Sequence, residues 1–132
     1  MIPRYRAWMK SLKWMCDVTN ISFDSKFVDI CQQGDTERYT EMSVEFDEIT
    51  LMQSTGLKDK NSQEIFEGDI VRQVRTQPIT ENETITGVVI MIEGAWLIMN
   101  DCEQLASDLW SETDENEIIG NVYENTELLE DK

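Results

Sequence analysis

Four carboxylates lie close together in the middle of the chain, within the sequence TGLKDKNSQEIFEGDIV at residues 55–71. They are Asp59, Glu64, Glu67 and Asp69. Carboxylate oxygens are the ligands that Mg²⁺ and Mn²⁺ prefer, so this spacing is compatible with a metal-dependent hydrolase. A nuclease of the restriction-enzyme type also needs a lysine two positions after its glutamate, where this chain has Phe66 and Asp69. We therefore predict no catalytic residue, no metal ligand and no cofactor here.

The same segment has the composition of a tight turn between two strands. Gly56 can adopt a positive φ, which costs other residues about 1–2 kcal/mol. Residues 58–62 are rich in Asp, Asn, Ser and Lys, and Gly68 permits a close approach of backbone before the next strand. We expect Ile65 or Phe66 to enter the core and the four acids to face water at the mouth of a small barrel.

Histidine is absent from the chain, which removes the commonest general base and the usual zinc ligand. The three cysteines, Cys16, Cys31 and Cys102, form no CxxC pair. An odd number without that spacing argues against a disulfide framework or a zinc ribbon. We expect all three to be reduced and semi-buried.

Charge is strongly negative and unevenly distributed, with a net value of −16. Residues 1–15 carry four basic side chains and no acid, whereas residues 101–132 carry eleven acids and one lysine. A field of this sign disfavours nonspecific binding of DNA or RNA. We interpret the basic arm as a counter-charge to the acidic C-terminal part, within one chain or between subunits.

Length and hydropathy indicate one domain, or two small subdomains, in 132 residues. No apolar run approaches the roughly 18 residues of a membrane span. The N-terminus is interrupted by charges and lacks the apolar core of a signal peptide. These features predict an intracellular protein that does not enter a membrane.

Short runs rich in β-branched and aromatic residues, separated by turn residues, predict an almost entirely β protein. The predicted strands are residues 5–9, 14–18, 21–23, 27–30, 44–51, 70–75, 84–92, 95–99 and 117–123. A shift in the alternation at Asp47 and Glu48 indicates a bulge in one strand. Glu93 and Gly94 predict a two-residue hairpin turn. This spacing of strands is typical of a small barrel or sandwich.

Two helical segments are expected near the C-terminus. Leu105, Leu109 and Trp110 have roughly helical spacing, which predicts one short helix near residues 102–110. Residues 124–129 predict a short helical turn or a tail.

Three blocks of sequence resemble the YopX family of phage and prophage proteins. They are PRYRAW at residues 3–8, LMQSTGLKDKNSQEIFEGDIV at residues 51–71, and IIGNVYENTELL at residues 118–129. The blocks occur in the family's order and span nearly the whole chain. The chain departs from the family pattern at Met9, Ser54, Ser62 and Thr126. Because the family has glycine where this chain has Ser62, we expect either that Asn61 carries the left-handed turn or that the turn relaxes.

The resemblance implies a fold, a setting and an assembly. It implies a mainly β fold, with an N-terminal β-hairpin region at residues 1–50 and an SH3-like barrel at residues 51–132, packed as one compact unit. It also implies a phage-encoded accessory protein in the host cytoplasm that forms a homo-oligomer. The family supplies no established biochemical activity, and no catalytic residue is carried over.

Three hypotheses for function remain open. The first is a non-enzymatic interaction module that binds itself, or a host or phage protein. The chain has four tryptophans, a residue type enriched at interfaces. The second is an acidic decoy that occupies a host DNA-binding protein. The third is nucleic-acid binding through the basic arm, with Lys10, Lys13, Arg72 and Arg75 contributing. The residues predicted to interact are Arg4, Arg6, Trp8, Trp14 and Trp96.

Overall fold

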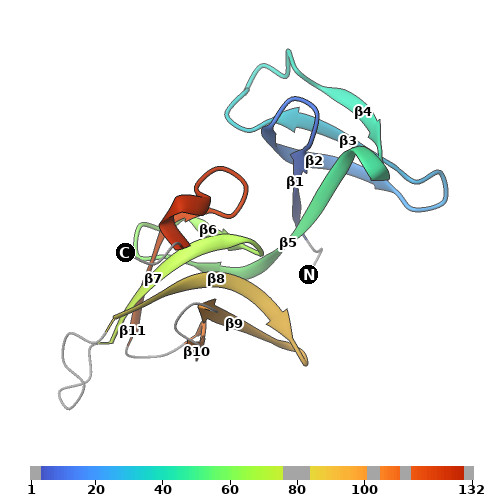
Figure 1. Cartoon of the computed structure of the whole chain (residues 1–132). Helices are drawn as coiled ribbons and strands as arrows, with labels where there is room; N and C mark the ends of the chain where they lie inside the picture. Colours follow the sequence, from blue (N-terminus) through green and yellow to red (C-terminus); the bar gives the residue numbers. More distant parts are fainter. Residues whose placement is uncertain (1–3, 76–83, 101–104, 111–113, 130–132) are drawn as a thin grey trace. The chain divides into compact units, whose positions relative to one another are not determined.

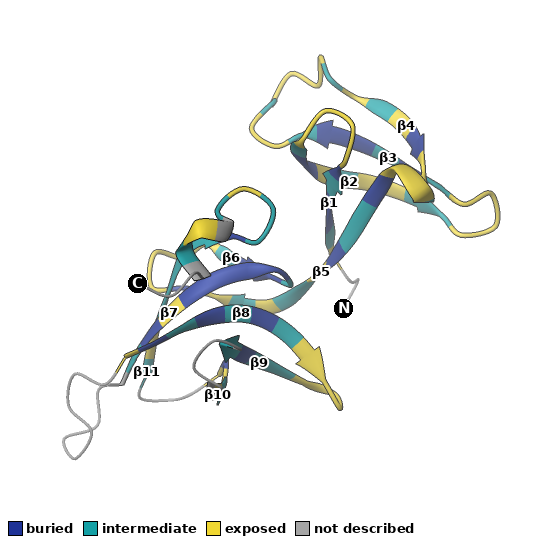
Figure 2. Ribbon diagram, viewed as in Figure 1, coloured by how far each residue is buried: buried dark blue, intermediate teal, exposed yellow. Residues whose placement is uncertain are grey.

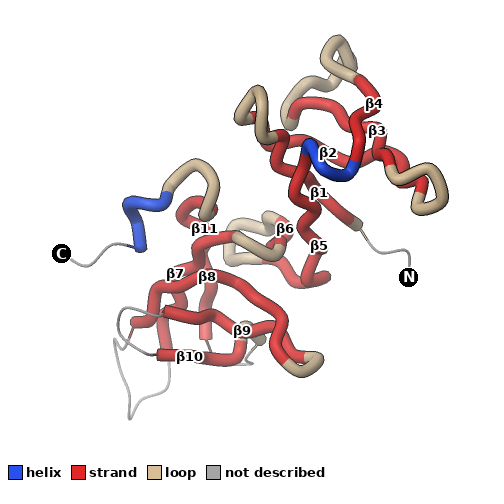
Figure 3. The backbone as a smooth tube through the Cα atoms, turned by 45° about the vertical axis from the view of Figure 1, so that its right-hand side comes forward, coloured by secondary structure: helices blue, strands red, loops and turns tan. Residues whose placement is uncertain are grey.

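A computed structural model describes residues 4–75, 84–100, 105–110 and 114–129 (Figure 1). The chain divides into two compact units, Met1–Ser54 and Thr55–Lys132. The strands are β1 Tyr5–Met9, β2 Trp14–Ser22, β3 Phe27–Gln32, β4 Met42–Glu45, β5 Ile49–Lys58, β6 Glu64–Phe66, β7 Asp69–Arg75, β8 Thr84–Ile92, β9 Ala95–Asn100, β10 Leu105–Asp108 and β11 Asp114–Asn121. The prediction of a mainly β protein is confirmed, since the described helices are two short 3₁₀ turns (Figure 3).

The first sheet has the strand order β4-β3-β2-β1-β5-β6. Strands β1 to β4 belong to the N-terminal unit, and β6 belongs to the C-terminal unit. Both predicted hairpins are confirmed, with Met9 opposite Trp14 and Ser22 opposite Phe27. Because side chains alternate between the faces of a strand, alternate apolar residues gather on one face. Together these residues form a buried cluster that includes Ala7, Cys16, Val28, Ile30, Val44 and Ile49.

One strand predicted at residues 44–51 is interrupted, so that prediction is wrong. A 3₁₀ turn at Phe46–Glu48 separates β4 from β5, which pair with β3 and β1 respectively. The Glu45 side chain accepts from the backbone N–H of Glu48, and the Glu48 carboxylate accepts from the N–H of Glu45. This reciprocal capping box stabilises a turn where the sequence pattern indicates only a bulge.

In the C-terminal unit, five antiparallel strands lie in the order β10-β9-β8-β7-β11. The buried cluster of this unit is Ile65, Val71, Val89, Ile98 and Leu109, and the buried stretches of β7 and β8 appear in dark blue in Figure 2. Among the described residues β10 and β11 are the two edges of this sheet, and no pairing closes it into a barrel. The structure thus gives two antiparallel sheets.

The helix predicted near residues 102–110 is wrong where the structure describes it. β10 pairs antiparallel with β9, with Leu105 opposite Asn100 and Asp108 opposite Leu97. The pairing continues just beyond the strand, where the Leu109 N–H donates to the Trp96 carbonyl at 3.1 Å. A helix as short as the one predicted is only marginally stable on its own, so pairing with β9 determines the conformation of this segment. Residues 102–104 of the prediction lie outside the described residues.

The β8–β9 hairpin forms as predicted, with Ile92 opposite Ala95. Both turn residues have positive φ, 51° at Glu93 and 83° at Gly94, as the favoured two-residue hairpin turns require. Gly87 allows the two strands to approach, because a Cβ there would lie 2.5 Å from the Met99 carbonyl oxygen.

The described helices are all too short to span a membrane. The final strand predicted at residues 117–123 corresponds to β11, and the helical turn predicted at residues 124–129 corresponds to the 3₁₀ turn Thr126–Leu129.

Candidate functional site

Asp59 is the centre of the turn in the acidic segment, and its carboxylate binds three backbone N–H groups. One oxygen, Oδ1, accepts from Asn61 and Gln63, both at 2.9 Å. The other, Oδ2, accepts from Ile118 of β11 at 3.0 Å. The Lys60 N–H also donates to the Asn116 carbonyl at 2.8 Å. Asp59 is only 8% exposed, so the prediction that this acid faces water is wrong.

Burial raises the pKa of the Asp59 carboxyl, but the three N–H donors and the nearby Lys60 lower it further than burial raises it. The net pKa lies below the ordinary value. The side chain is therefore an ionised structural group that joins the loop after β5 to β11. A carboxylate whose lone pairs are used in this way is poorly placed to serve as a catalytic base.

Asp69 has a similar structural role at the start of β7. Its Oδ2 accepts from the Phe66 N–H at 2.8 Å, and the side chain is buried. Gly68 lies between them with φ +88°, and its carbonyl accepts from the Val122 N–H at 3.0 Å. Here too the expectation of a solvent-facing acid is wrong, because the carboxylate closes a turn.

The four acids do not converge on a common point. No three of these four acids have carboxylate oxygens within 4.8 Å of one another. Among the described residues, the acids that meet this criterion are Glu45, Asp47 and Glu48. Those three are exposed and belong to the capped 3₁₀ turn of the N-terminal unit. The acidic segment therefore has the geometry of a scaffold.

Ser62 adopts the left-handed conformation of this turn, with φ +67°. The expectation that Asn61 would carry it is wrong, since Asn61 is not among the described residues with positive φ. The Ser62 N–H donates to the Asp59 carbonyl at 2.9 Å, which fixes the residue in place. Hydrogen bonds to Asp59 thus hold a non-glycine residue in a conformation that glycine adopts more easily.

The motif GNVYEN at residues 120–125 forms a second structural turn. The Asn121 Oδ1 accepts from the N–H groups of Tyr123 and Glu124 at 3.0 and 2.9 Å, and its Nδ2 donates to the Glu124 carboxylate at 2.8 Å. The Asn125 Oδ1 accepts from the Asn121 N–H at 3.2 Å. A Cβ at Gly120 would lie 2.6 Å from that oxygen, which explains the glycine.

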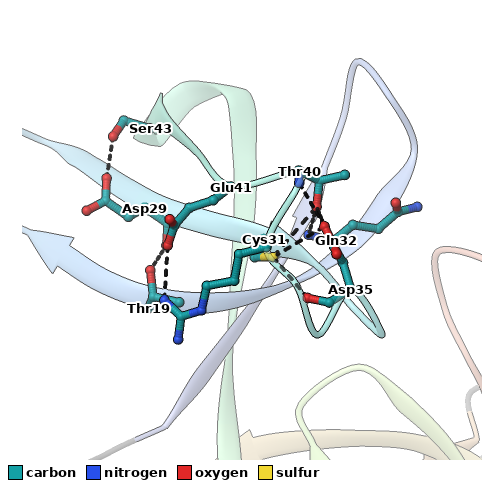
Figure 4. A network of polar contacts seen from close by, with 9 residues as sticks. Thr19, Asp29, Cys31, Gln32, Asp35, Thr40, Glu41 and Ser43 are labelled. Carbon is teal, nitrogen blue, oxygen red and sulfur yellow. Dashed lines mark hydrogen bonds and ion pairs between the residues drawn. The ribbon is translucent and has the colours of Figure 1, made fainter.

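A polar network at one end of β3 resembles a nucleophile with an acid beside it (Figure 4). The Asp35 Oδ2 accepts from the N–H and hydroxyl of Thr40, both at 2.7 Å, and the Cys31 Sγ lies 3.8 Å from the same oxygen. These bonds from Thr40 lower the pKa of Asp35. The network therefore closes the β3–β4 connection.

Cys16 and Cys31 are free and buried, as predicted, and Cys102 lies outside the described residues. Burial raises the pKa of the Cys16 thiol to about 11, with smaller contributions from Asp17 and Cys31. At neutral pH this thiol is protonated and packs as a small apolar group.

The predicted interaction residues are dispersed over both units. Arg4 is exposed, whereas Arg6 is only 6% exposed and its Nε lies 3.4 Å from the Met52 sulfur. Trp8 is half-buried on the same face of β1 as Arg6. Trp14 and Trp96 are half-buried against the hydrophobic clusters of the first and second unit respectively.

A groove of about 280 Å³ in the C-terminal unit is a candidate site. Its lining comes from the end of β5 with the following loop, from the residues after β10, and from the start of β11. The lining residues are Leu57, Lys58, Asp59, Lys60, Leu109, Trp110, Asp114, Glu115 and Asn116. Trp110 is 61% exposed, more than Trp8, Trp14 or Trp96. The sequence patterns described above do not predict this groove.

Two polar side chains, the buried Gln73 and the half-buried Asn116, hold the backbone that leads to Trp110. The Gln73 Nε2 donates to the carbonyls of Asp108 and Leu109 at 3.1 and 3.4 Å. The Asn116 Nδ2 donates to the same Leu109 carbonyl at 2.8 Å. Leu109 is fully buried, so the backbone immediately before Trp110 is held from both sides. Because this backbone is already fixed, it loses little conformational freedom if Trp110 contacts a partner.

The fold and this groove define an all-β protein whose buried motif carboxylates stabilise turns and whose most accessible tryptophan lines an open groove. The chain matches the family described as YopX protein over residues 4–130, and it belongs to that family. Protein EF1440 from Enterococcus faecalis is 31% identical over 98% of this chain and 99% of its own, with a TM-score of 0.62. Protein yopX from Bacillus subtilis is 20% identical over 96% of this chain and 98% of its own, with a TM-score of 0.59.

No curated protein matches the chain. The family match confirms the resemblance to the YopX family. The matched family and structures are named without an activity, so they indicate no enzymatic family.

Proposed function

We propose that this chain is a non-enzymatic interaction module that forms homo-oligomers and binds through the Trp110 groove. The single observation that carries the proposal is a 61% exposed tryptophan that follows a hydrogen-bonded backbone and lines the groove together with Leu57. Exposed, pre-positioned aromatic side chains are the usual centres of binding energy in protein interfaces.

The state of the carboxylates supports a non-enzymatic role. Asp59, Asp69 and Asp35 are each hydrogen-bonded to backbone N–H groups, and the pKa values of Asp59 and Asp35 lie below the ordinary range. General acid–base catalysis needs the reverse shift, toward the working pH. These acids serve the fold.

Sedimentation velocity of the full chain tests the proposal, over a series from ~10 to ~500 µM, the range in which weak interfaces associate. We expect species larger than a monomer, and we expect Trp110→Ala to reduce them. Tyr39→Ala, at an 84% exposed aromatic outside the groove, serves as the matched control and leaves the distribution unchanged. A wild-type chain that stays monomeric throughout contradicts the proposal.

A second candidate, the acidic decoy, is favoured by the net charge of −16 and by the exposure of many acids, among them Asp24, Glu37, Asp47 and Glu115. It predicts a salt-sensitive complex with a host DNA-binding protein, because phosphate mimicry depends on screened charge. A lysate pull-down at low salt that recovers no such protein argues against it.

Nucleic-acid binding through the basic arm has less support. Arg6 is buried, and Arg72 pairs with Glu117 at 2.5 Å. A gel shift at low salt, repeated with Arg4→Ala, tests it directly.

The setting of this module is also a proposal. The family resemblance supports a phage-encoded accessory protein acting in the host cytoplasm. The strand order β10-β9-β8-β7-β11, an antiparallel meander with its last strand beside its first, supports an SH3-like arrangement of the C-terminal unit.

A further inference from the structure

The groove's charged side chains favour a cationic occupant. Lys60 lies 3.8 Å from the Glu117 carboxylate, so its charge is partly balanced. Lys58 is opposed by the lining carboxylates of Asp114 and Glu115, and the buried Asp59 adds a further negative charge. The whole chain carries −16, so the long-range field adds to the local excess of acids.

Trp110 adds a preference for an occupant that is both apolar and cationic. The indole face attracts ammonium and guanidinium groups and also packs against aliphatic carbons. Leu57, which is half-buried, extends the apolar part of the lining. The groove therefore suits an aliphatic side chain flanked by basic residues.

The β1–β2 turn of this same chain has that chemistry. Its sequence is Lys-Ser-Leu-Lys at residues 10–13, and Leu12 is 46% exposed between the exposed Lys10 and Lys13. The Lys13 N–H donates to the Met9 carbonyl at 2.8 Å, which fixes the turn. A fixed turn loses little conformational entropy when it binds.

The other exposed apolar side chains at turns lack this flanking charge. Phe23 is followed directly by Asp24, and Met91 and Ile92 are followed directly by Glu93. An acid beside the apolar group would be repelled by Asp114 and Glu115, which line the groove. Tyr39 follows Arg38, whose guanidinium pairs with Glu41 at 3.2 Å. Leu12 is the described exposed hydrophobic residue whose turn contains lysines and no acid.

We propose that the Trp110 groove of one copy binds the β1–β2 turn of a second copy, residues 10–13, with Leu12 against Trp110 and the lysines toward Asp114 and Glu115. This inference rests on the proposed self-association and identifies its two surfaces. The contact is heterologous, since a turn meets a groove, so each copy can use its own turn and its own groove at once. The product is a closed ring or a chain. One such contact is small, which places it among weak interfaces.

Two single variants separate the two halves of the contact. Leu12→Asp removes the apolar group of the turn and leaves the groove intact, whereas Trp110→Ala does the reverse. Both side chains are exposed, so the fold is expected to survive, and circular dichroism checks it. Tyr39→Asp introduces the same charge at another exposed site of the N-terminal unit and is the matched control for Leu12→Asp.

Sedimentation velocity of each variant alone, and of an equimolar mixture, gives the test. We expect each variant alone to be monomeric at concentrations where the wild type associates. The mixture forms a 1:1 dimer and nothing larger, because one intact turn meets one intact groove and no further contact remains. Raising the salt concentration weakens this dimer, since lysines and carboxylates contribute to it.

Three outcomes would overturn the inference. Association of the wild type that neither variant weakens leaves the proposed function standing and removes these two surfaces. If both variants are monomeric and their mixture stays monomeric, the interface is symmetric and the turn-in-groove contact is wrong. A monomeric wild type refutes the self-association itself.

Discussion

Replacing Ser62 with glycine should stabilise the C-terminal unit. Ser62 has φ +67°, a conformation that costs a residue with a Cβ about 1–2 kcal/mol. Ser62 is exposed, and its hydroxyl makes no hydrogen bond in the described part of the chain, so the substitution removes no contact. Glycine also increases the conformational entropy of the unfolded chain, which destabilises the folded state by about 0.5–1 kcal/mol. The net gain is about 0.5–1 kcal/mol.

Thermal unfolding of the two proteins measures this gain. For a unit of fewer than 100 residues it corresponds to an increase in Tm of about 2–8 °C. Hydrogen exchange at the amides around Asp59 and Ile118, the two residues joined by the turn, assigns the gain to this unit.

The matched control is Asn61→Gly, one residue earlier in the same turn. Asn61 has no positive φ, so glycine there relieves nothing and only adds freedom to the unfolded chain. We expect it to lower stability by about 0.5–1 kcal/mol. If Ser62→Gly is as destabilising as Asn61→Gly, the left-handed conformation costs nothing here, and our account of the turn is refuted.

Four further predictions concern single groups. Asp59→Asn should lower the free energy of unfolding by about 2 kcal/mol in denaturant titrations, because a charged acceptor of three N–H groups is lost. Since the folded-state pKa of Asp59 is lowered, its contribution to the free energy of unfolding is complete above the ordinary carboxyl pKa, near pH 4, and is lost as the pH falls through the folded-state pKa. In the Asp59→Asn variant the free energy of unfolding should therefore depend less on pH in this acidic range. Gly87→Ala should cost about 2–3 kcal/mol by thermal unfolding, because the new Cβ meets the Met99 carbonyl. Cys16, with its pKa raised to about 11, should resist iodoacetamide in the native protein near pH 8 and react after unfolding, as followed by peptide mass spectrometry.

Local sequence patterns were sufficient to predict most of the strands. Alternation and β-branched residues predict β1 to β3 and β7 to β9, and Glu93-Gly94 predicts a turn in which both residues have positive φ. Two errors came from interactions that a local pattern does not contain. The reciprocal bonds of Glu45 and Glu48 form a 3₁₀ turn in place of a bulge, and β9 pairs with residues whose leucine spacing suggests a helix.

The candidate groove was beyond local reasoning for a related reason. Its lining comes from residues 57–60, 109–110 and 114–116, and the bonds of Asp59 and Lys60 to β11 help to bring these segments together. The sequence signal that could have indicated this is Asp59 itself, an acid in a turn motif shared with a family. We interpreted it as a solvated loop residue, whereas its burial shows a group that organises tertiary structure.

The pairing of β7 with β11 has a consequence for synthesis on the ribosome. The N-terminal unit has all its strands once Gln53 has been translated, because β5 pairs with β1 through that residue. In the other sheet β7 pairs with β8 along one edge, but its second edge stays unpaired until residues 114–121 leave the exit tunnel. A nascent chain stalled between these points therefore presents an unpaired strand edge, which is the kind of surface that chaperones bind and that nucleates aggregates.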